Sequence, residues 1–543
     1  MLLRLPPLLC AAAAAALLPG ATTAAALLPG VTAAASALPP ACAAALDPPT
    51  SLRTGADILS FPLPLTATLD DCIALCCQTS TCVALSFNLP QPEATAVGGM
   101  ACAVGGACCM LKGRVPPLNA SNPWPGAVRS ATLALGAGPG PAPPFAPSTA
   151  IASAALAQGP PALWGDGRAD GDTWASAWLA DGRTLAWVCD TTYGPMALME
   201  LQGDPYASAL AAAVVAPDPL PWLDLCKAFN ASRAEDYGNI KAGGMAEVNG
   251  TLYVGVSCIN YGFDSTLFVR QHNLAGFVAA SSDGGRSWAN ITAVGAFPGR
   301  FAAPVFTSCG RGAPCPDPDL PGVQWTYVFF TGSAYNDASY WESGDAHYLA
   351  RVAPTADALA RPAAYQYYAG TSGGALPRAQ WSPDATQAQP VLAFGRMLGE
   401  NNIHYNAQLG RWVCANYGFL DTAGNPSTWH QQPWHTKDTP RRTQLLMLEA
   451  PQPWGPWRAF FRDDDFGGAW NGSGAYGTTF PAAFHTQVVN GSAQMSMLFA
   501  CGNGLAGCHY QLNYMNVTLQ LSPEGVEHAA KAAAEQAGDG KRV

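Results

Sequence analysis

Three acidic residues stand where the sequence predicts that a strand begins or a polar loop folds. Asp172 precedes a predicted strand, Glu400 precedes the predicted strand Ile403–Asn406, and Glu342 lies in the polar loop 335–345. Two carboxyl groups that face each other across a cleft can act as a general acid and a base or nucleophile. Glycosidic bonds are cleaved in this way, with carboxyl separations of about 5 Å for retention and about 6.5–9.5 Å for inversion. We therefore take all three as candidate catalytic residues.

Each assignment competes with another interpretation of the same residue. Asp172 could equally be a turn or cap carboxylate, and Asp166 and Asp190 are weaker alternatives for its role. Glu400 and Glu342 compete for the role of the acid, which requires a pKa raised by burial or by a nearby carboxylate. Sequence alone does not choose between them.

A second set of residues could bind a substrate beside these acids. Trp174 offers a flat aromatic face on which a sugar ring can stack. Lys241 could hold a carboxylate or a hydroxyl group, unless it is a solvated turn cation. His404, Tyr405 and Asn406 could bind sugar hydroxyls, with a structural histidine as the alternative for His404.

We expect neither a cofactor nor a metal. The sequence contains no nucleophile elbow, phosphate loop or dinucleotide fingerprint, and no cluster of cysteine and histidine has zinc-ligand spacing. Asp463-Asp464-Asp465 lacks the alternating oxygen ligands of a calcium loop, so a solvated acidic loop is the favoured interpretation.

Strands must position these side chains, because residues 162–522 contain short runs with period-two alternation, separated by Gly, Asn and Asp turns. Many short strands of this kind predict a sandwich, a barrel or a propeller. The predicted strands are Leu185–Cys189, Met245–Val248, Leu252–Ser257, Gly276–Ser281, Trp325–Thr331, Ile403–Asn406, Trp412–Tyr417, Gln444–Glu449, Met495–Ala500 and Tyr514–Leu521.

One segment decides among these folds. Ser281, Asp283, Gly285 and Trp288 fit the pattern S-x-D-x-G-x-x-W, which resembles the Asp box of sialidase-like propellers. Its expected roles are structural: the carboxylate accepts turn amides, the glycine permits a positive φ and the tryptophan packs under the hairpin. About 360 residues at four strands per blade suit a five-bladed β-propeller, so we predict a mainly β fold.

A wider resemblance covers nearly all of residues 164–521. Its motifs include Asp170–Trp174, Gly238–Gly244, His347–Val352 and Ala450–Trp457. These resemble a secreted five-bladed propeller family long labelled as of unknown function, which is similar in fold to glycoside hydrolase family 43. Some members are described as arabinan-cleaving glycoside hydrolases. The resemblance implies such an activity here, with a polysaccharide or a glycoprotein glycan as the partner.

The first residues predict entry into the secretory pathway. Arg4 precedes the apolar run Leu8–Leu18, which has the length of a signal-peptide core, and Pro19-Gly20 ends the run before the ~20 residues of a membrane span. We interpret residues 1–45 as a signal peptide with an Ala-rich leader. The mature protein is then expected outside the cell, in the cell wall or extracellular matrix, with no membrane span.

Cysteines and glycosylation sequons agree with secretion. Of the 17 cysteines, Cys10 leaves with the signal peptide, and the even remainder favours disulfides over free thiols. The pairs Cys309/Cys315 and Cys501/Cys508 span short loops and predict local disulfides. Seven sequons predict glycosylation at the surface, at Asn119, Asn230, Asn249, Asn290, Asn471, Asn490 and Asn516.

Residues 51–134 form a Cys-rich unit ahead of the predicted propeller. Cys72 and Cys76 fall on one face of a predicted helix, the strand Ala84–Asn88 follows, and Cys108–Lys112 closes the pattern. This order resembles the PAN/apple module, a small disulfide-rich α+β domain. The resemblance implies a protein or carbohydrate ligand, and a disulfide-held spacer is the alternative.

Composition separates the remaining parts. Gly, Pro and Ala dominate residues 135–161, which predicts a linker, and the Ala-rich tail 523–543 predicts a frayed helix or disorder. A net charge of −10 with scattered basic residues argues against nucleic acid as a partner. Two functions stay open: a glycoside hydrolase-like enzyme, and a non-catalytic carbohydrate-binding or adhesion protein on the same scaffold.

Overall fold

The structure is a computed structural model of the chain. Before residue 141 it describes Cys72 and nine short strands. From there it describes residues 141–164, 170–207, 210–220, 225–227, 238–260, 271–312, 314–334, 336–372, 378–400, 403–420, 424, 426–427, 442–467, 475–501 and 508–539. The chain divides into Met1–Pro39 and Pro40–Val543, and all described residues belong to the second unit. The predicted signal peptide, Asp166, Asn230 and Asn471 lie outside the described residues.

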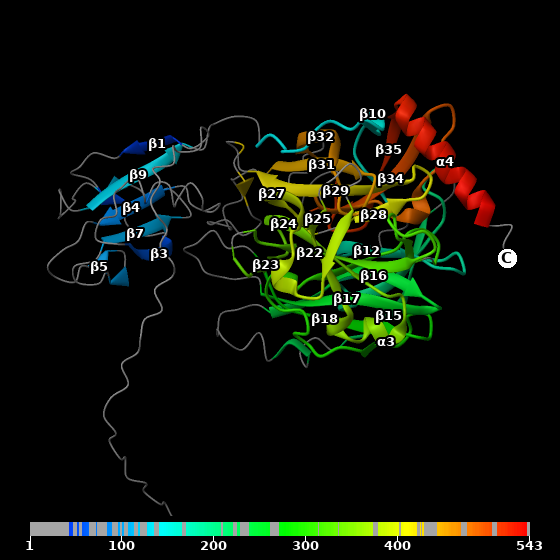
Figure 1. Ribbon diagram of the computed structural model, residues 1–543, viewed down its shortest axis with the longest axis horizontal. Helices are drawn as coiled ribbons and strands as arrows, with labels where there is room; N and C mark the ends of the chain where they lie inside the picture. The colour runs from blue at the N-terminus through cyan, green and yellow to red at the C-terminus, as the bar shows by residue number, and fades with distance from the viewer. Residues whose placement is uncertain are drawn as a thin grey trace, which may run out of the picture. The chain divides into compact units, whose positions relative to one another are not determined.

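An antiparallel sheet forms the N-terminal part of the described chain (Figure 1). The disulfide Cys72–Cys109 ties Cys72 to β7, and β4 has the bounds predicted from its alternating residues. The first strand lies in the predicted leader and pairs with β9, so this unit begins earlier than residue 51. In sheet order the strands are β1 (Ala43–Leu46), β9 (Val128–Ala134), β4 (Ala84–Asn88), β7 (Ala107–Lys112) and β3 (Asp57–Leu63); two ribbons pair β2 (Leu52–Arg53) with β8 (Leu118–Asn119) and β5 (Ala96–Val97) with β6 (Met100–Ala101).

Antiparallel sheets also make up residues 141–521, and all ten strands predicted there are present. The first sheet has the order β12 (Asp172–Trp178), β13 (Thr184–Thr191), β14 (Gly194–Gln202) and β15 (Ala211–Pro217). The second sheet joins two meanders. One is β16 (Gly238–Val248), β17 (Thr251–Asn260), β18 (His272–Ser281) and β19 (Ala289–Asn290); the other is β20 (Pro304–Thr307), β22 (Gln324–Gly332), β24 (Gly344–Val352), β25 (Gln366–Thr371) and β26 (Ala379–Ser382), with β21 (Cys315–Pro316), β23 (Ser339–Tyr340) and β27 (Pro390–Leu398) at its sides.

The third and fourth sheets follow in chain order, and the fourth also contains strands from the beginning of this region. The third contains β28 (Ile403–Asn406), β29 (Arg411–Leu420), β31 (Arg442–Ala450) and β32 (Arg458–Phe466), with β30 (Pro426–Ser427) beside β29. The fourth contains β33 (Tyr476–Thr479), β34 (Ser492–Ala500), β35 (Asn513–Leu521) and β10 (Ile151–Leu156), with β11 (Ala162–Leu163) also paired to β35. Part of the predicted linker is therefore a strand, which its Ala-rich sequence concealed.

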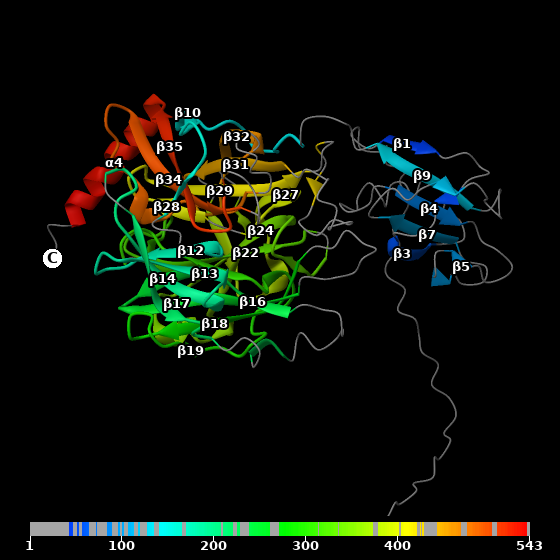
Figure 2. The same cartoon turned by 180° about the vertical axis from the view of Figure 1, so that it is seen from behind.

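Helices are few in the described residues. Cys72 and residues 225–227 are helical, and the helices with described bounds are α3 (Ala356–Leu359), the 3-10 turns η1 (Gly299–Phe301), η2 (Pro362–Ala364), η3 (Ala385–Gln387) and η5 (Ala482–Phe484), and α4 (Pro523–Asp539). The predicted frayed tail is the helix α4, which lies beside β35 in both views (Figures 1 and 2). Within the described residues, no helix has the length and apolar character needed to cross a membrane. The prediction of a mainly β fold is confirmed.

The first strands of the successive sheets meet one another. β12 contacts β16, β16 contacts β20, β20 contacts β28, and β33 contacts both β29 and β12. Gly244 lets two of these strands approach, because a Cβ atom there would overlap the backbone of Phe306. The contacts thus run from β12 around the molecule and back to it.

Apolar layers fill the spaces between these neighbouring sheets. Trp187 and Phe277 belong to the layer between the β12–β15 and β16–β18 strands, and further layers follow in chain order. The last layer joins Leu498 of β34 to Trp174 of β12. Strands such as β13 are buried along most of their length, which explains their nearly continuous apolar sequence.

The turn after β18 has the structural role expected from its residue pattern. The Asp283 carboxylate accepts the backbone N–H groups of Arg286 and Ser287 at 3.0 and 2.9 Å, and the Trp288 indole donates to the carbonyl of Gly285 at 2.9 Å. Trp288 packs against Trp187 with ring centroids 4.9 Å apart. The Ser287 hydroxyl, which donates to this carboxylate at 2.6 Å, and the turn N–H groups hold the pKa of Asp283 well below its usual range. Asp283 therefore fixes the turn that packs one sheet on the next.

Cysteine pairing differs from the sequence expectation in one respect. The structure contains the disulfides Cys309–Cys315 and Cys501–Cys508, and also Cys226–Cys258. Cys189 and Cys414 are free, buried thiols. The expectation that the even number of cysteines favours disulfides over free thiols was wrong for these two, because each is enclosed in an apolar layer as a small hydrophobic residue.

We predict that Gly285→Ala lowers the free energy of unfolding by about 2–4 kcal/mol, because its φ is positive and the new Cβ would overlap the Leu198 side chain. Gly250→Ala is the matched control, since Gly250 also has a positive φ but no atom lies within 4 Å of the new Cβ. It should cost about 1 kcal/mol. Urea unfolding measures both, and equal losses would contradict the packing role of this turn.

Candidate active site

A buried lysine lies between two carboxylates at the start of the β12 and β16 strands. Lys241 of β16 is 1% exposed, and its Nζ donates to Asp172 Oδ1 at 3.3 Å and to Asp190 Oδ2. The Asn239 amide also donates to Asp190 Oδ1, at 2.6 Å. Because a buried charge is costly unless it is paired, the two carboxylates and the ammonium need one another. The interpretation of Lys241 as a solvated turn cation was wrong.

Two tyrosines complete the surroundings of Asp172, one from β33 and one from the segment between β34 and β35. The hydroxyls of Tyr476 and Tyr510 donate to Asp172 Oδ2 at 3.0 and 3.2 Å. Oδ1 accepts from Lys241 and, at 3.5 Å, from the Thr173 hydroxyl. An ionised carboxylate has about four acceptor positions, so the donors around Asp172 nearly fill them. Asp172 is thus held rigidly, well beyond the turn or cap role considered from sequence.

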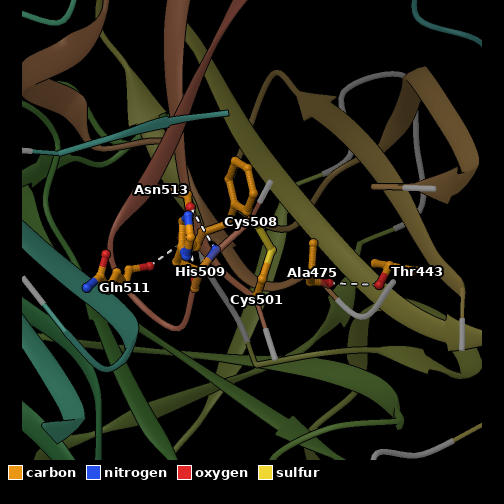
Figure 3. The surroundings of a disulfide bond; sticks show 8 residues. Thr443, Ala475, Cys501, Cys508, His509, Gln511 and Asn513 are labelled. Carbon is orange, nitrogen blue, oxygen red and sulfur yellow. Dashed lines mark hydrogen bonds between the residues drawn. A yellow bond between two sulfur atoms is a disulfide. The ribbon is translucent and has the colours of Figure 1, made fainter. Parts of the chain in front are cut away.

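Tyr510 lies in the segment that follows the disulfide Cys501–Cys508, and Figure 3 shows this disulfide with His509, Gln511 and Asn513 beside it. The Cys501 N–H donates to the His509 carbonyl at 3.2 Å. The Asn513 amide then donates to the carbonyls of His509 and Gln511, both at 2.8 Å. The segment is thereby folded on both sides of Tyr510, which fixes the direction of its side chain.

Glu400 and Glu342 reach the same region from the other sheets. The backbone N–H of Glu400 donates to the Tyr417 hydroxyl at 3.4 Å, and the Tyr417 ring lies 6.3 Å from that of Tyr476. Both glutamates are buried, and both act electrostatically on the Tyr417 hydroxyl. Trp341, next to Glu342, lies 5.9 Å from Lys241 Nζ. We call these residues, Asp172, Asp190, Lys241, Glu342, Glu400, Tyr417, Tyr476 and Tyr510, the central acid cluster.

Burial and charge set the protonation of the cluster. Burial raises the pKa of Glu400 well above its usual range, and the Asp172 carboxylate raises it further while Lys241 opposes the rise. Burial also raises the pKa of Asp172, against the opposing effects of Lys241 and the Tyr476 hydroxyl. Glu400 is therefore suited to stay protonated and to donate a proton, as an acid must.

Unusual backbone conformations gather around the cluster. Thr173, Asp190, Ser343 and Arg396 have φ values of 55°, 52°, 56° and 60°, a region that residues with side chains rarely adopt. Thr173 follows Asp172, Ser343 follows Glu342, and Arg396 lies in the strand that leads to Glu400. Such conformations persist only where the surroundings enforce them, and they concentrate at functional sites. This observation is independent of the side-chain contacts and points to the same place.

All four sheets of residues 141–521 contribute to the central acid cluster. Asp172 comes from the first, Lys241 from the second, Tyr417 from the third and Tyr476 from the fourth. The sequence predicted Asp172, Lys241, Glu342 and Glu400, and it named Asp190 as an alternative. It missed Tyr417, Tyr476 and Tyr510. Tyr476 at the start of β33 could have been found from the same strand-start argument that selected Glu400.

Four predicted substrate-binding residues lie elsewhere. Trp174 is 1% exposed and packs in the apolar layer with Trp164, so it offers no face to a sugar. His404 is buried and shares a hydrogen bond of 2.9 Å with the Thr479 hydroxyl, and burial lowers its pKa to about 4. Asn406 accepts the N–H groups of Gln408 and Leu409 in the turn after β28, and Tyr405 packs on Trp412. The structure therefore does not bring these four side chains together with the central acid cluster, because each is engaged in packing or in hydrogen bonds outside it.

The acidic run Asp463-Asp464-Asp465 is not a loop, since it lies within β32. Asp464 accepts from Arg462 at 2.6 Å and from Gln444 at 2.9 Å, which neutralises it locally. Among the residues that the structure describes, no group of three His, Cys, Asp or Glu side chains is arranged to hold a metal ion.

Comparison with protein families identifies the N-terminal unit. The family model described as "PAN domain" matches residues 52–112. This part of the chain is a PAN domain. The match covers the strand β4 and the cysteines on which the sequence resemblance rested. No curated protein is significantly similar to the chain.

Solved structures with some similarity to the chain include carbohydrate-active enzymes. The GH43_1 enzyme from Xanthomonas citri has 12% identity and a TM-score of 0.33, with 65% of this chain and 88% of that chain covered. The endo-arabinase from Bacteroides thetaiotaomicron has 9% identity and a TM-score of 0.30, with 66% and 97% covered. The exo-beta-1,3-galactanase from Phanerochaete chrysosporium has 9% identity and a TM-score of 0.34, with 67% and 64% covered. At this level of similarity, the activity of the chain has to be argued from its own residues.

We predict that Lys241→Met lowers the free energy of unfolding at pH 7 by about 3–5 kcal/mol, because it leaves two neighbouring carboxylates without their cation. The pKa of Asp172 is raised in the folded state, so its protonation favours folding at low pH and this contribution is lost as pH rises. The loss should therefore be smaller at pH 5 than at pH 7 in urea unfolding.

The double variant Lys241→Met with Asp172→Asn is the control for this prediction, because it removes one of the two uncompensated charges. It should recover part of the lost stability at pH 7. Equal losses in the single variant at pH 5 and pH 7, with no recovery in the double variant, would show that the ion pairs do not hold this region together.

Proposed function

We propose that this protein is a secreted, carbohydrate-active propeller that acts as a glycoside hydrolase on an extracellular or cell-wall polysaccharide. The observation that carries the proposal is the convergence of Glu400, Asp172 and Asp190, from separate strands, on one buried cluster with a protonated acid and ionisable partners. By family resemblance the substrate is of the arabinan type. The PAN domain then binds a protein or glycan ligand that brings the enzyme to its substrate.

A five-bladed propeller is the arrangement that we propose for residues 141–521. The closed sequence of contacts among β12, β16, β20, β28 and β33 supports it, as does the pairing of β10 with β35, which joins the beginning of this region to its end. In this arrangement the second sheet counts as two blades, since β16 and β20 pair in parallel at only one register position, Gly244 with Val305. The cluster then lies where the inner strands of all blades converge.

Glu400 is the proposed general acid. Burial and the nearby Asp172 charge raise its pKa and favour its protonated form, which can give a proton to the leaving oxygen of a glycosidic bond. Glu342 lies near the same Tyr417 hydroxyl and is the alternative acid. Tyr417 holds the backbone of Glu400 in place.

We assign the general base to one of the two aspartates that form ion pairs with Lys241. Asp172 is nearly saturated with donors, whereas the Asp190 side chain is 30% exposed. A carboxylate that activates water must be reachable by water, which favours Asp190 for that step and leaves Asp172 to orient Lys241 and raise the pKa of Glu400. Asp172, the first choice from sequence, stays essential in this account through its charge.

A catalytically silent lectin is the second candidate, and one observation favours it. The donors around Asp172 leave little acceptor capacity for a substrate or a water molecule. A site of this kind could bind a glycan on a rigid polar surface without cleaving it.

We predict that Glu400→Gln reduces the release of reducing sugar from a polysaccharide panel by about 10²–10⁴-fold, because the amide keeps the shape but cannot donate an acid proton. Asp172→Asn and Asp190→Asn should each reduce the rate as well. Glu200→Gln, on the half-buried end of β14, is the control and should leave the rate unchanged. Saturable glycan binding without turnover in the wild type would favour the lectin.

The pH dependence follows from the same acid. Since only protonated Glu400 is active, kcat/KM should fall as pH rises through its raised pKa. Asp172→Asn removes a negative charge that raises this pKa, so the alkaline limb of the profile should move to lower pH in that variant. A limb that does not move would assign the acid to another residue.

Secretion predicts glycans at the exposed sequons. Asn249, Asn290 and Asn490 are exposed, whereas Asn516 is half-buried in β35 and its amide donates to the Pro205 carbonyl at 3.3 Å. Mass spectrometry after expression in a secreting eukaryotic cell should find glycans at the first three and not at Asn516. Intracellular retention of the full chain without glycans would contradict secretion.

A further inference from the structure

A second cavity lies away from the central acid cluster, between the edges of two sheets. It has a volume of about 610 Å³. Tyr368 of β25 and Trp454, from the turn between β31 and β32, lie on its apolar side together with prolines. Asp319, Thr371, Arg378 and Gln452 supply its polar groups. None of these residues belongs to the cluster, so the cavity is a separate feature of the molecule.

The aromatic side of the cavity is held in place by the layers behind it. Tyr368 and Trp454 are stacked with an interplanar angle of 13° and ring centroids 6.5 Å apart. Trp381 meets Trp454 edge-on, with centroids 5.8 Å apart, and the Arg351 guanidinium also lies against it, 4.3 Å from the ring. Arg351 is itself fixed by Asp317 at 3.0 Å. The cavity therefore has a rigid aromatic side that needs no rearrangement to receive a ligand.

The polar groups that line the cavity include donors and acceptors, and this combination indicates the class of ligand. Arg378 donates hydrogen bonds, Asp319 accepts them, and Gln452 and Thr371 can do both. An anion such as phosphate would be repelled by Asp319, and a purely apolar ligand would make no use of the polar groups that line the cavity. A neutral ligand with several hydroxyl groups, each able to donate and to accept, matches the mixture. Its C–H faces match the aromatic and proline surface.

We propose that this cavity binds a neutral sugar residue of a glycan. The volume lies within the range of small-molecule sites, and the pairing of an aromatic side with a ring of mixed polar groups gives both affinity and orientation. The inference deepens the proposed function, because a non-catalytic sugar site on the same body would hold a polysaccharide near the central acid cluster. It also stands if the protein is a lectin.

The test uses the full chain with Glu400→Gln, so that no oligosaccharide is consumed during the measurement. Calorimetry with arabinotriose, xylotriose and galactotriose should show saturable binding of at least one of them. Adding Arg378→Ala and Gln452→Ala should weaken that binding at least tenfold, since both residues face the cavity and neither belongs to an apolar layer. Arg361→Ala is the matched control, because Arg361 is an exposed arginine paired with Asp357 near α3, and it should leave binding unchanged.

Other outcomes would overturn the proposal. Binding that is unaffected by the double substitution would place the sugar elsewhere, and no binding of any of the three probes would remove the neutral-sugar assignment. Tighter binding of inorganic phosphate, of galacturonate or of a proline-rich peptide at these residues would assign the cavity to another class of ligand. Trp fluorescence quenching on titration gives an independent reading through Trp454 and Trp381. Failure of the proposed hydrolysis is separate, because it would appear as unchanged turnover in Glu400→Gln with cavity binding intact.

Discussion

The central acid cluster depends on one interaction, an ammonium group that is shared by two carboxylates. Lys241 is buried, and it is stable there only because Asp172 and Asp190 approach it from β12 and β13. Asp172 is in turn fixed by the hydroxyls of Tyr476 and Tyr510. The ion pairs thus connect the first and second sheets, and the Tyr476 hydrogen bond connects Asp172 to the last sheet.

This arrangement requires unfavourable backbone conformations. Thr173 and Asp190 both adopt positive φ, as do Ser343 and Arg396 near the two glutamates. A β-branched residue such as Thr173 adopts that conformation only when surrounding contacts enforce it. The apolar layers pack around the strands that contain Thr173 and Asp190, whereas Ser343 lies in the bend before β24. Rigid placement is what an acid of altered pKa needs in order to meet a scissile bond.

Sequence patterns predicted the strands well, because period-two alternation and Gly or Asn turns are local properties. Every strand proposed for residues 162–522 is present, and the acids at strand starts, Asp172 and Glu400, meet in one cluster. The direction of a strand relative to the centre is not local, and this is where prediction failed. His404, Tyr405 and Asn406 of β28 were assigned a substrate-binding role, but their side chains make hydrogen bonds or aromatic contacts outside the central acid cluster. Trp174 was predicted to stack on a sugar ring, but its side chain packs in an apolar layer.

Two other predictions failed because the residue types involved do not distinguish between the alternative structures. The Ala-rich β10 has the composition of a linker, and it becomes a strand only through its pairing with β35. Cys189 and Cys414 were counted as disulfide partners because parity cannot recognise a buried free thiol. Burial raises the pKa of Cys189 to about 12, so this thiol next to the cluster stays unreactive and serves packing.

The account depends on Glu400 being protonated at neutral pH, and infrared spectroscopy tests this directly. A protonated carboxyl group has a C=O stretching band that is distinct from the bands of a carboxylate. The difference spectrum between the wild-type protein and Glu400→Gln at pH 7 should contain that band, and it should vanish as pH rises through the raised pKa of Glu400. A difference spectrum that contains only carboxylate bands at pH 7 would mean that Glu400 is ionised, and the proposed acid would then have no proton to give.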